Sequence, residues 1–213
     1  MSTIASSRLQ RLARPAAAPR EPAPAPQPAG ERCELCGEPL PEQHRHIVDV
    51  QARALLCACR ACVLLLDRDG AGGGHFRLVP ERRRRLEDFR LDDAAWDALA
   101  IPVGLAFFFH ATPAGRVVAF YPGPMGATES ALPLDAWGEL AAANPALAGL
   151  EPDVEALLVN RALGAREYWI VPIDDCYRLV ALIRTNWRGL NGGAEVREAT
   201  TRFFDHLREE ATC

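Results

Sequence analysis

The strands expected in this chain are marked by runs of branched and aromatic residues. Two such runs, at 103–110 and 116–121, flank a Thr-Pro-Ala-Gly segment that suits a turn, and they predict a β-hairpin. The first run contains three consecutive phenylalanines, so we expect this strand to be buried on both faces. A second hairpin is predicted from residues 167–173 and 176–185, and a further strand from the alternating residues 75–79.

Helices are expected where apolar residues recur at spacings of three and four. Residues 194–210 show this pattern most clearly and predict a helix with one apolar face. Residues 134–143 and 152–163 predict two more, the second bounded by a proline near its start and a glycine after its end. Asp92 is a candidate N-cap for another short helix. This order predicts an α+β fold, with an antiparallel or mixed sheet and helices packed on one face.

Composition divides the chain into three parts. Residues 1–30 are rich in proline and alanine and predict a disordered tail, because they cannot bury enough apolar surface to offset the entropy of ordering. Residues 31–69 hold five of the seven cysteines and form a candidate metal-binding module. A glycine-rich connection spans 69–74, and the α+β domain is expected over 75–210.

The overall composition is that of a globular protein, with 49% hydrophobic and 24% charged residues. No apolar run approaches the length that spans a bilayer, and residues 1–30 lack the apolar stretch of a secretory signal. We therefore expect a cytoplasmic location. In that compartment, paired cysteines are typical of metal or redox sites and not of disulfides.

Two Cys-x-x-Cys pairs are the most specific chemical motif in the chain. Cys33 and Cys36 form the first, and Cys59 and Cys62 follow after 22 residues. Each pair directs two thiolates at one ion, and together they supply a tetrahedral set that suits structural zinc. Iron in a rubredoxin-like site is the alternative, since the same four sulfurs suit both metals. Residues 31–69 are too few for an independent core, so metal binding is expected to fold them.

The segment between the pairs leaves two questions open. Residues 46–50 and 53–56 predict a hairpin, and residues 62–66 then form either a helix, as in treble-clef fingers, or a strand, as in zinc ribbons. The helix is favoured, because its N-terminal dipole stabilises thiolate charge. Cys57 is an alternative ligand, since it faces the same side as Cys59 in a strand. His44 and His46 are further alternatives in a polar segment that otherwise indicates a surface turn.

Three other segments carry weaker signals. Residues 82–85 are consecutive arginines, but a net charge of −4 and a pI near 5.8 disfavour nucleic-acid binding. A solvated turn is expected there, with docking to an acidic protein surface as the open alternative. Residues 121–130 match no nucleotide-binding motif and predict an ordered loop, our first candidate binding surface outside the metal site. Residues 174–175 predict a turn beside a packed Cys176 that lacks an identifiable base. No catalytic residue is predicted, and a binding role is favoured over an enzyme.

Several strings resemble a known family. They are Cys-Glu-Leu-Cys-Gly at 33–37, Cys-Ala-Cys-Arg-Ala-Cys at 57–62, Asp-Arg-Asp-Gly-Ala-Gly-Gly-Gly at 67–74, Val-Ala-Phe-Tyr-Pro-Gly-Pro-Met-Gly-Ala-Thr-Glu-Ser at 118–130 and Ile-Arg-Thr-Asn-Trp-Arg-Gly-Leu at 183–190. The family is an uncharacterised bacterial one, encoded beside genes of actinobacterial-type high-affinity NiFe hydrogenases. The resemblance covers residues 31–210. It implies an accessory, maturation or electron-transfer role, by association of genes and not by chemistry.

Together these inferences favour a non-enzymatic, zinc-binding accessory protein that helps to assemble or mature a NiFe hydrogenase through protein–protein contacts. The four paired cysteines are its predicted metal ligands, and the α+β domain is expected to supply the docking surface for hydrogenase subunits or maturation factors. The alternatives are a rubredoxin-like iron electron carrier and a nucleic-acid-binding zinc module, the second disfavoured by the acidic pI.

Overall fold

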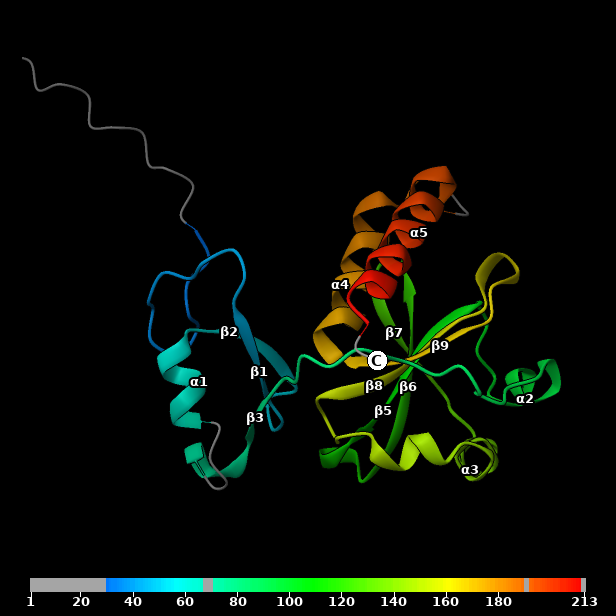
Figure 1. Cartoon of the computed structure of the whole chain (residues 1–213), viewed down its shortest axis with the longest axis horizontal. Coiled ribbons are helices and arrows are strands. Elements are labelled where there is room, and N and C mark those ends of the chain that lie inside the picture. The colour runs from blue at the N-terminus through cyan, green and yellow to red at the C-terminus, as the bar shows by residue number, and fades with distance from the viewer. Residues whose placement is uncertain (1–29, 67–70, 190–191, 212–213) are drawn as a thin grey trace, which may run out of the picture. The chain divides into compact units, whose positions relative to one another are not determined.

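Residues 30–66, 71–189 and 192–211 are described in the computed structural model of the chain (Figure 1). The predicted tail lies outside these residues except for Gly30, and so do positions 69–70 of the predicted glycine-rich connection. The rest of that connection forms a short 3-10 turn, Ala71–Gly74.

A three-stranded antiparallel sheet forms the N-terminal module. β1 (Arg45–Asp49) and β2 (Ala54–Ala58) make the predicted hairpin. β3 (Phe76–Leu78) pairs with the other edge of β1, which gives the strand order β2-β1-β3. The strand predicted at 75–79 therefore forms, but it belongs to the small sheet and not to the domain at 75–210 in which we had placed it.

The core of this module is small. Helix α1 (Arg60–Leu66) follows β2 and packs Val63 against Ile47 and Ala58, and these three are the buried members of its apolar cluster. Leu35 and Phe76 are among the partly buried residues around them. So few buried side chains cannot offset the entropy of ordering the module, so another interaction must contribute to its stability.

A six-stranded antiparallel sheet forms the larger part, in the order β4-β9-β8-β5-β6-β7. Its strands are β4 (Arg84–Arg85), β5 (Leu105–Ala111), β6 (Arg116–Gly123), β7 (Gly126–Ser130), β8 (Glu155–Asn160) and β9 (Glu167–Pro172). The hairpin predicted at 103–121 is confirmed as β5 and β6. The predicted loop at 121–130 is instead part of the β6–β7 hairpin, and its strands pair up to Gly123 and Gly126.

Helices cover both faces of the large sheet. α4 (Ile173–Asn186) and α5 (Gly193–Glu209) share a buried cluster with Phe107 and Phe109 of β5. Phe108 points to the opposite face and stacks on Trp137 of α3 (Leu134–Ala143), beside α2 (Asp93–Ala98). β5 is thus buried on both faces, as predicted, whereas the expectation of helices on one face only was wrong. No helix in the described ranges has the length and apolarity needed to cross a membrane.

Two helices formed as the sequence pattern predicts. α3 has the predicted bounds, and α5 buries Ala199, Phe203 and Leu207 on one face. The predicted cap of α2 is also present, because the Asp92 carboxylate accepts a hydrogen bond of 2.8 Å from the backbone N–H of Ala95.

The helix predicted at 152–163 is wrong. Residues Glu155–Asn160 form β8, which pairs with β5 on one side and β9 on the other. All six of its residues are buried, and its continuous Ala-Leu-Leu-Val run is typical of a strand covered on both faces. The bounding proline and glycine do flank a regular element, but that element is a strand and not a helix.

The strand predicted at 176–185 is also wrong, because this segment is the helix α4. Ile173, Cys176, Leu179, Val180 and Ile183 are buried, and their spacings of three and four place them on one face. The predicted turn at 174–175 is the first turn of that helix, where acidic side chains favour the helix dipole. Cys176 is packed and fully buried, as expected.

The arginine cluster forms ion pairs with buried acids and is not the solvated turn we expected. Glu155 is 0% exposed, and Arg82 donates to its carboxylate through Nε and, at 2.6 Å, through Nη2. Arg83 Nε donates to the buried Asp175 at 2.6 Å. These two cations join the connection after the small sheet to β8 and α4.

We predict that Arg82→Ala lowers the free energy of unfolding by about 2–3 kcal/mol, because it leaves the Glu155 carboxylate buried without its cation. Arg84 is exposed, and within the described residues its side chain donates a single long bond, of 3.5 Å, to Ala146 O. Arg84→Ala is therefore the matched control, expected within about 0.5 kcal/mol of the wild type. Urea unfolding measures both variants. Equal losses for the two would contradict an internal role for Arg82.

Candidate metal centre

The first cysteine pair lies in a tight turn. The N–H of Gly37 donates to Cys33 O at 2.8 Å, and the N–H of Cys33 donates to Glu38 O at 2.8 Å, which closes the turn around the pair. Gly37 has a φ of +79°, a conformation that side-chain-bearing residues rarely adopt. Cys33 is buried and Cys36 exposed, so one edge of the centre faces solvent.

The second pair lies where β2 passes into α1. Cys59 precedes the helix, and Cys62 lies in its first turn. The N–H of Cys62 lies 3.5 Å from Cys59 Sγ, and the N–H of Val63 donates to Cys59 O at 3.0 Å. A helix N-terminus favours negative charge, so this location stabilises thiolates. The helical alternative for residues 62–66 is confirmed.

The four sulfur atoms converge. The Sγ atoms of Cys33, Cys36, Cys59 and Cys62 all lie within 4.8 Å of one another, and those of Cys36 and Cys59 are 3.6 Å apart. Four sulfurs about 2.3 Å from a central ion would be about 3.8 Å from each other. These separations suit four sulfur ligands of one ion, and the centre is that of a metal-binding module.

The thiols of the centre ionise unequally. Burial alone would raise the pKa of Cys33, but backbone N–H groups of Cys59, Leu35 and Cys36 lower it to about 6. Burial together with the neighbouring thiols raises the pKa of Cys62 to about 12. The centre therefore accepts one negative charge readily and resists the next, until a cation offsets the repulsion.

A family model for a family of unknown function, DUF5947, matches residues 32–211 of the chain. The chain belongs to this family. The match includes the four cysteines and both sheets, so the DUF5947 family model spans the metal centre and the large domain together. Comparison with curated proteins and with solved structures found no match.

Cys57 belongs to a different cluster in this DUF5947 chain. Its Sγ, one ring nitrogen of His44 and one of His46 lie within 4.8 Å of one another, as a group separate from the four paired thiols. As metal ligands, we had considered all three residues as alternatives within the four-cysteine site. The sequence alone did not show this cluster, because it does not give the register between β1 and β2, in which His46 lies opposite Cys57.

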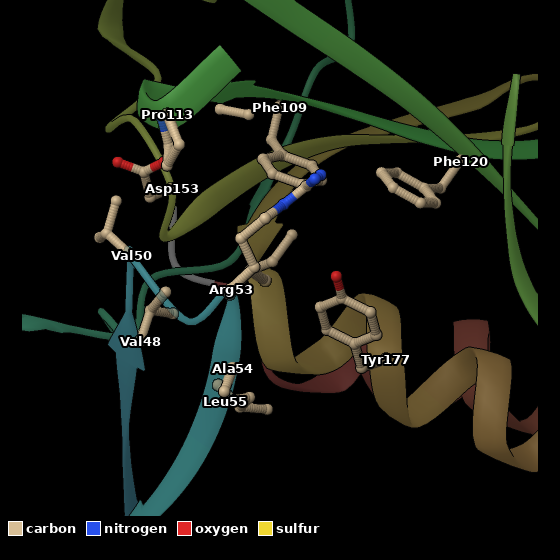
Figure 2. Close-up of a pocket in the computed structure, with 12 residues that line it drawn as sticks. Val48, Val50, Arg53, Ala54, Leu55, Phe109, Pro113, Phe120, Asp153 and Tyr177 are labelled. Atoms are coloured by element: carbon tan, nitrogen blue, oxygen red, sulfur yellow. The ribbon is translucent and has the colours of Figure 1, made fainter. Parts of the chain in front are cut away.

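A second candidate site is a cavity of about 240 Å³ between the small sheet and the large domain. Figure 2 shows Arg53 and Tyr177 extending into it beside Phe109 and Phe120. Asp153 also lines the cavity, but its carboxylate accepts hydrogen bonds from Thr112 N at 2.7 Å and Thr112 Oγ1 at 2.5 Å. The cavity is smaller than most ligand pockets and its acid is already engaged, so the metal centre is the better-supported site.

Metal binding by the four-cysteine centre is expected to release protons. Hydrogen bonding to the Glu38 N–H opposes a rise in the pKa of Cys36, but the thiols of Cys33 and Cys59 raise it overall. Cys36 and Cys62 must therefore lose protons when zinc binds at pH 7, whereas Cys33 is already largely ionised. We predict that zinc affinity falls as the pH drops below neutral, with proton release measurable in weakly buffered titrations of the metal-free protein. An affinity independent of pH would contradict this electrostatic picture.

Proposed function

We propose that this protein is a zinc-binding accessory factor that helps to assemble or mature a NiFe hydrogenase through protein–protein contacts. The observation that supports zinc binding is the convergence of four thiols within 4.8 Å, where a tight turn meets the start of a helix. The role in hydrogenase assembly or maturation rests on the resemblance of residues 31–210 to a family encoded beside hydrogenase genes.

Zinc in a structural role is favoured over iron by the form of the centre. Four protein ligands leave no open coordination position for substrate, which is typical of structural zinc. Neither pair has the Cys-Pro-x-Cys-Gly sequence usual in rubredoxin-like turns, because Glu34 and Arg60 occupy the proline positions. The ion would thereby supply the cross-link that the small apolar core of the module needs.

Exposed apolar side chains are the candidate contacts for a protein partner. Met125 lies between β6 and β7, in the segment we had singled out as a binding surface, and is 91% exposed. On α1, Leu64 and Leu65 are 60% and 69% exposed, next to the metal centre. Side chains of this kind are typical of surfaces that bind another protein.

Protein purified without added metal is expected to contain about one tightly bound zinc per chain, to be colourless and to show no reversible one-electron couple. Elemental analysis with a visible spectrum measures this directly. Cys36→Ser should lose the zinc, whereas Cys176→Ala, which removes a buried thiol of the large domain, should keep it. A red, iron-containing protein would contradict the zinc assignment and favour the electron carrier.

Deleting the gene should lower hydrogenase activity in cells that express the hydrogenase. Complementation by the wild type should restore activity, and complementation by Met125→Glu or by the double variant Leu64→Glu/Leu65→Glu should restore less. Leu163→Glu is the matched control, because Leu163 is also exposed, at 81%, but lies outside both candidate surfaces. Unchanged hydrogenase activity in the deletion strain would refute the proposed role.

A further inference from the structure

We propose that His44, His46 and Cys57 form a second metal site, which binds an exchangeable divalent ion of the late first transition series. The three ligand atoms lie within 4.8 Å of one another. This site shares no ligand with the four-cysteine centre, although both belong to the N-terminal module.

The hairpin places these residues together. His46 of β1 lies directly opposite Cys57 of β2 in the antiparallel register, and such cross-strand partners project from the same face of the sheet. His44 precedes β1 by one residue, two positions before His46, and the two imidazole rings are 4.9 Å apart. The polar segment in which we had expected a surface turn therefore places the imidazole rings of His44 and His46 close together.

Hydrogen bonds fix the orientation of both rings. His46 Nδ1 donates to the Asp174 carboxylate at 2.9 Å, and His44 Nδ1 donates to Pro41 O at 3.1 Å. Each acceptor requires the proton on Nδ1, which leaves the lone pair on Nε2 for a ligand. Carboxylate and backbone carbonyl partners of this kind are the usual support of metal-bound histidines.

His44 Nε2 is buried and has no hydrogen-bond partner within the described residues. The His44 side chain is only 6% exposed, and the carboxylate of Glu31 lies 3.6 Å from Nε2, beyond hydrogen-bonding distance. A buried nitrogen without a partner is energetically unfavourable, and a bound metal would remove that cost. This unsatisfied atom is the strongest single indication that the cluster binds an ion.

The donor set identifies the class of ion. Two imidazole nitrogens and one thiolate suit zinc, cobalt, nickel or copper, and they do not suit magnesium or calcium, which prefer oxygen. Three protein ligands leave one position open, unlike the four-cysteine centre. This open position gives solvent and competing ligands access to the ion, so the ion can exchange. The Glu31 side chain is 68% exposed and leaves the position open to solvent.

The second site is linked to the first through the backbone of Cys57. The N–H of Cys57 donates to the Glu34 carboxylate at 2.7 Å, and Cys57 O accepts from the N–H of Glu34 at 3.0 Å. Glu34 lies between the ligands Cys33 and Cys36. Folding of the four-cysteine centre thus helps to position the thiol of the second site.

Cobalt titration of the zinc-loaded protein tests the proposal. We expect one Co²⁺ per chain to bind at the second site and to give a near-ultraviolet thiolate-to-cobalt band. Cys57→Ser should abolish that band, and the double variant His44→Ala/His46→Ala should abolish binding. His206→Gln is the matched control, because His206 lies half exposed on α5 and should leave binding unchanged.

Asp174→Asn tests whether Asp174 positions His46. The variant keeps all three metal ligands but weakens the hydrogen-bond acceptor of His46 Nδ1. We expect a 10–100-fold loss of Co²⁺ affinity, with the thiolate-to-cobalt band retained. Zinc measured before titration reports whether each variant still folds its four-cysteine centre, so a misfolded variant is recognised by zero zinc. Failure of the zinc-loaded wild-type protein to bind any Co²⁺ would overturn the proposal. So would a thiolate band that persists in Cys57→Ser.

Discussion

The convergence of four cysteine sulfurs within 4.8 Å of one another is the constraint on which the N-terminal module depends. One of them, Cys33, is stabilised as a thiolate by backbone N–H groups, but Cys62 is held protonated by burial and by its neighbours. A divalent cation converts this unfavourable cluster into a cross-link. The apolar cluster of the module has only three buried residues among those described, so we expect the free energy of metal binding to contribute to its folding.

The folded module in turn makes contacts with the larger sheet. Val48 and Val79 join the apolar cluster that includes Ile173 at the start of α4. His46 donates to Asp174 in the same helical turn, and Arg83 pairs with Asp175 next to it. The first turn of α4 thus receives apolar, hydrogen-bonded and ionic contacts from residues before the large sheet begins. Loss of the metal is therefore expected to affect this end of α4 as well as the module.

The sequence predicted the local features well. The paired cysteines, the hairpin between them, the helix after the second pair and the Asp92 cap all depend on residues near one another in the chain, and all are present. β8 was assigned to the wrong class because its bounding proline and glycine also suit the ends of a helix, and α4 because its branched and aromatic composition was weighed above its periodicity. A short apolar run such as β8 fits either element until its neighbours are known, and β5 and β9 decide the case by pairing with it.

The features that were missed depend on contacts distant in sequence. Arg82 and Glu155 are 73 residues apart, and His46 and Asp174 are 128 apart, so neither partner could be inferred from spacing. The cluster of His44, His46 and Cys57 needed the strand register. Only the excess of thiols over the four required, visible in Cys57, indicated that a second group of ligands was present.

X-ray absorption at the zinc edge tests the central claim, the four-cysteine centre, most directly. The measurement should use protein purified without added metal and dialysed to remove exchangeable ions. The account predicts a single shell of four sulfur atoms at about 2.3 Å. A shell that contains nitrogen or oxygen, or the absence of zinc from folded protein, would contradict it.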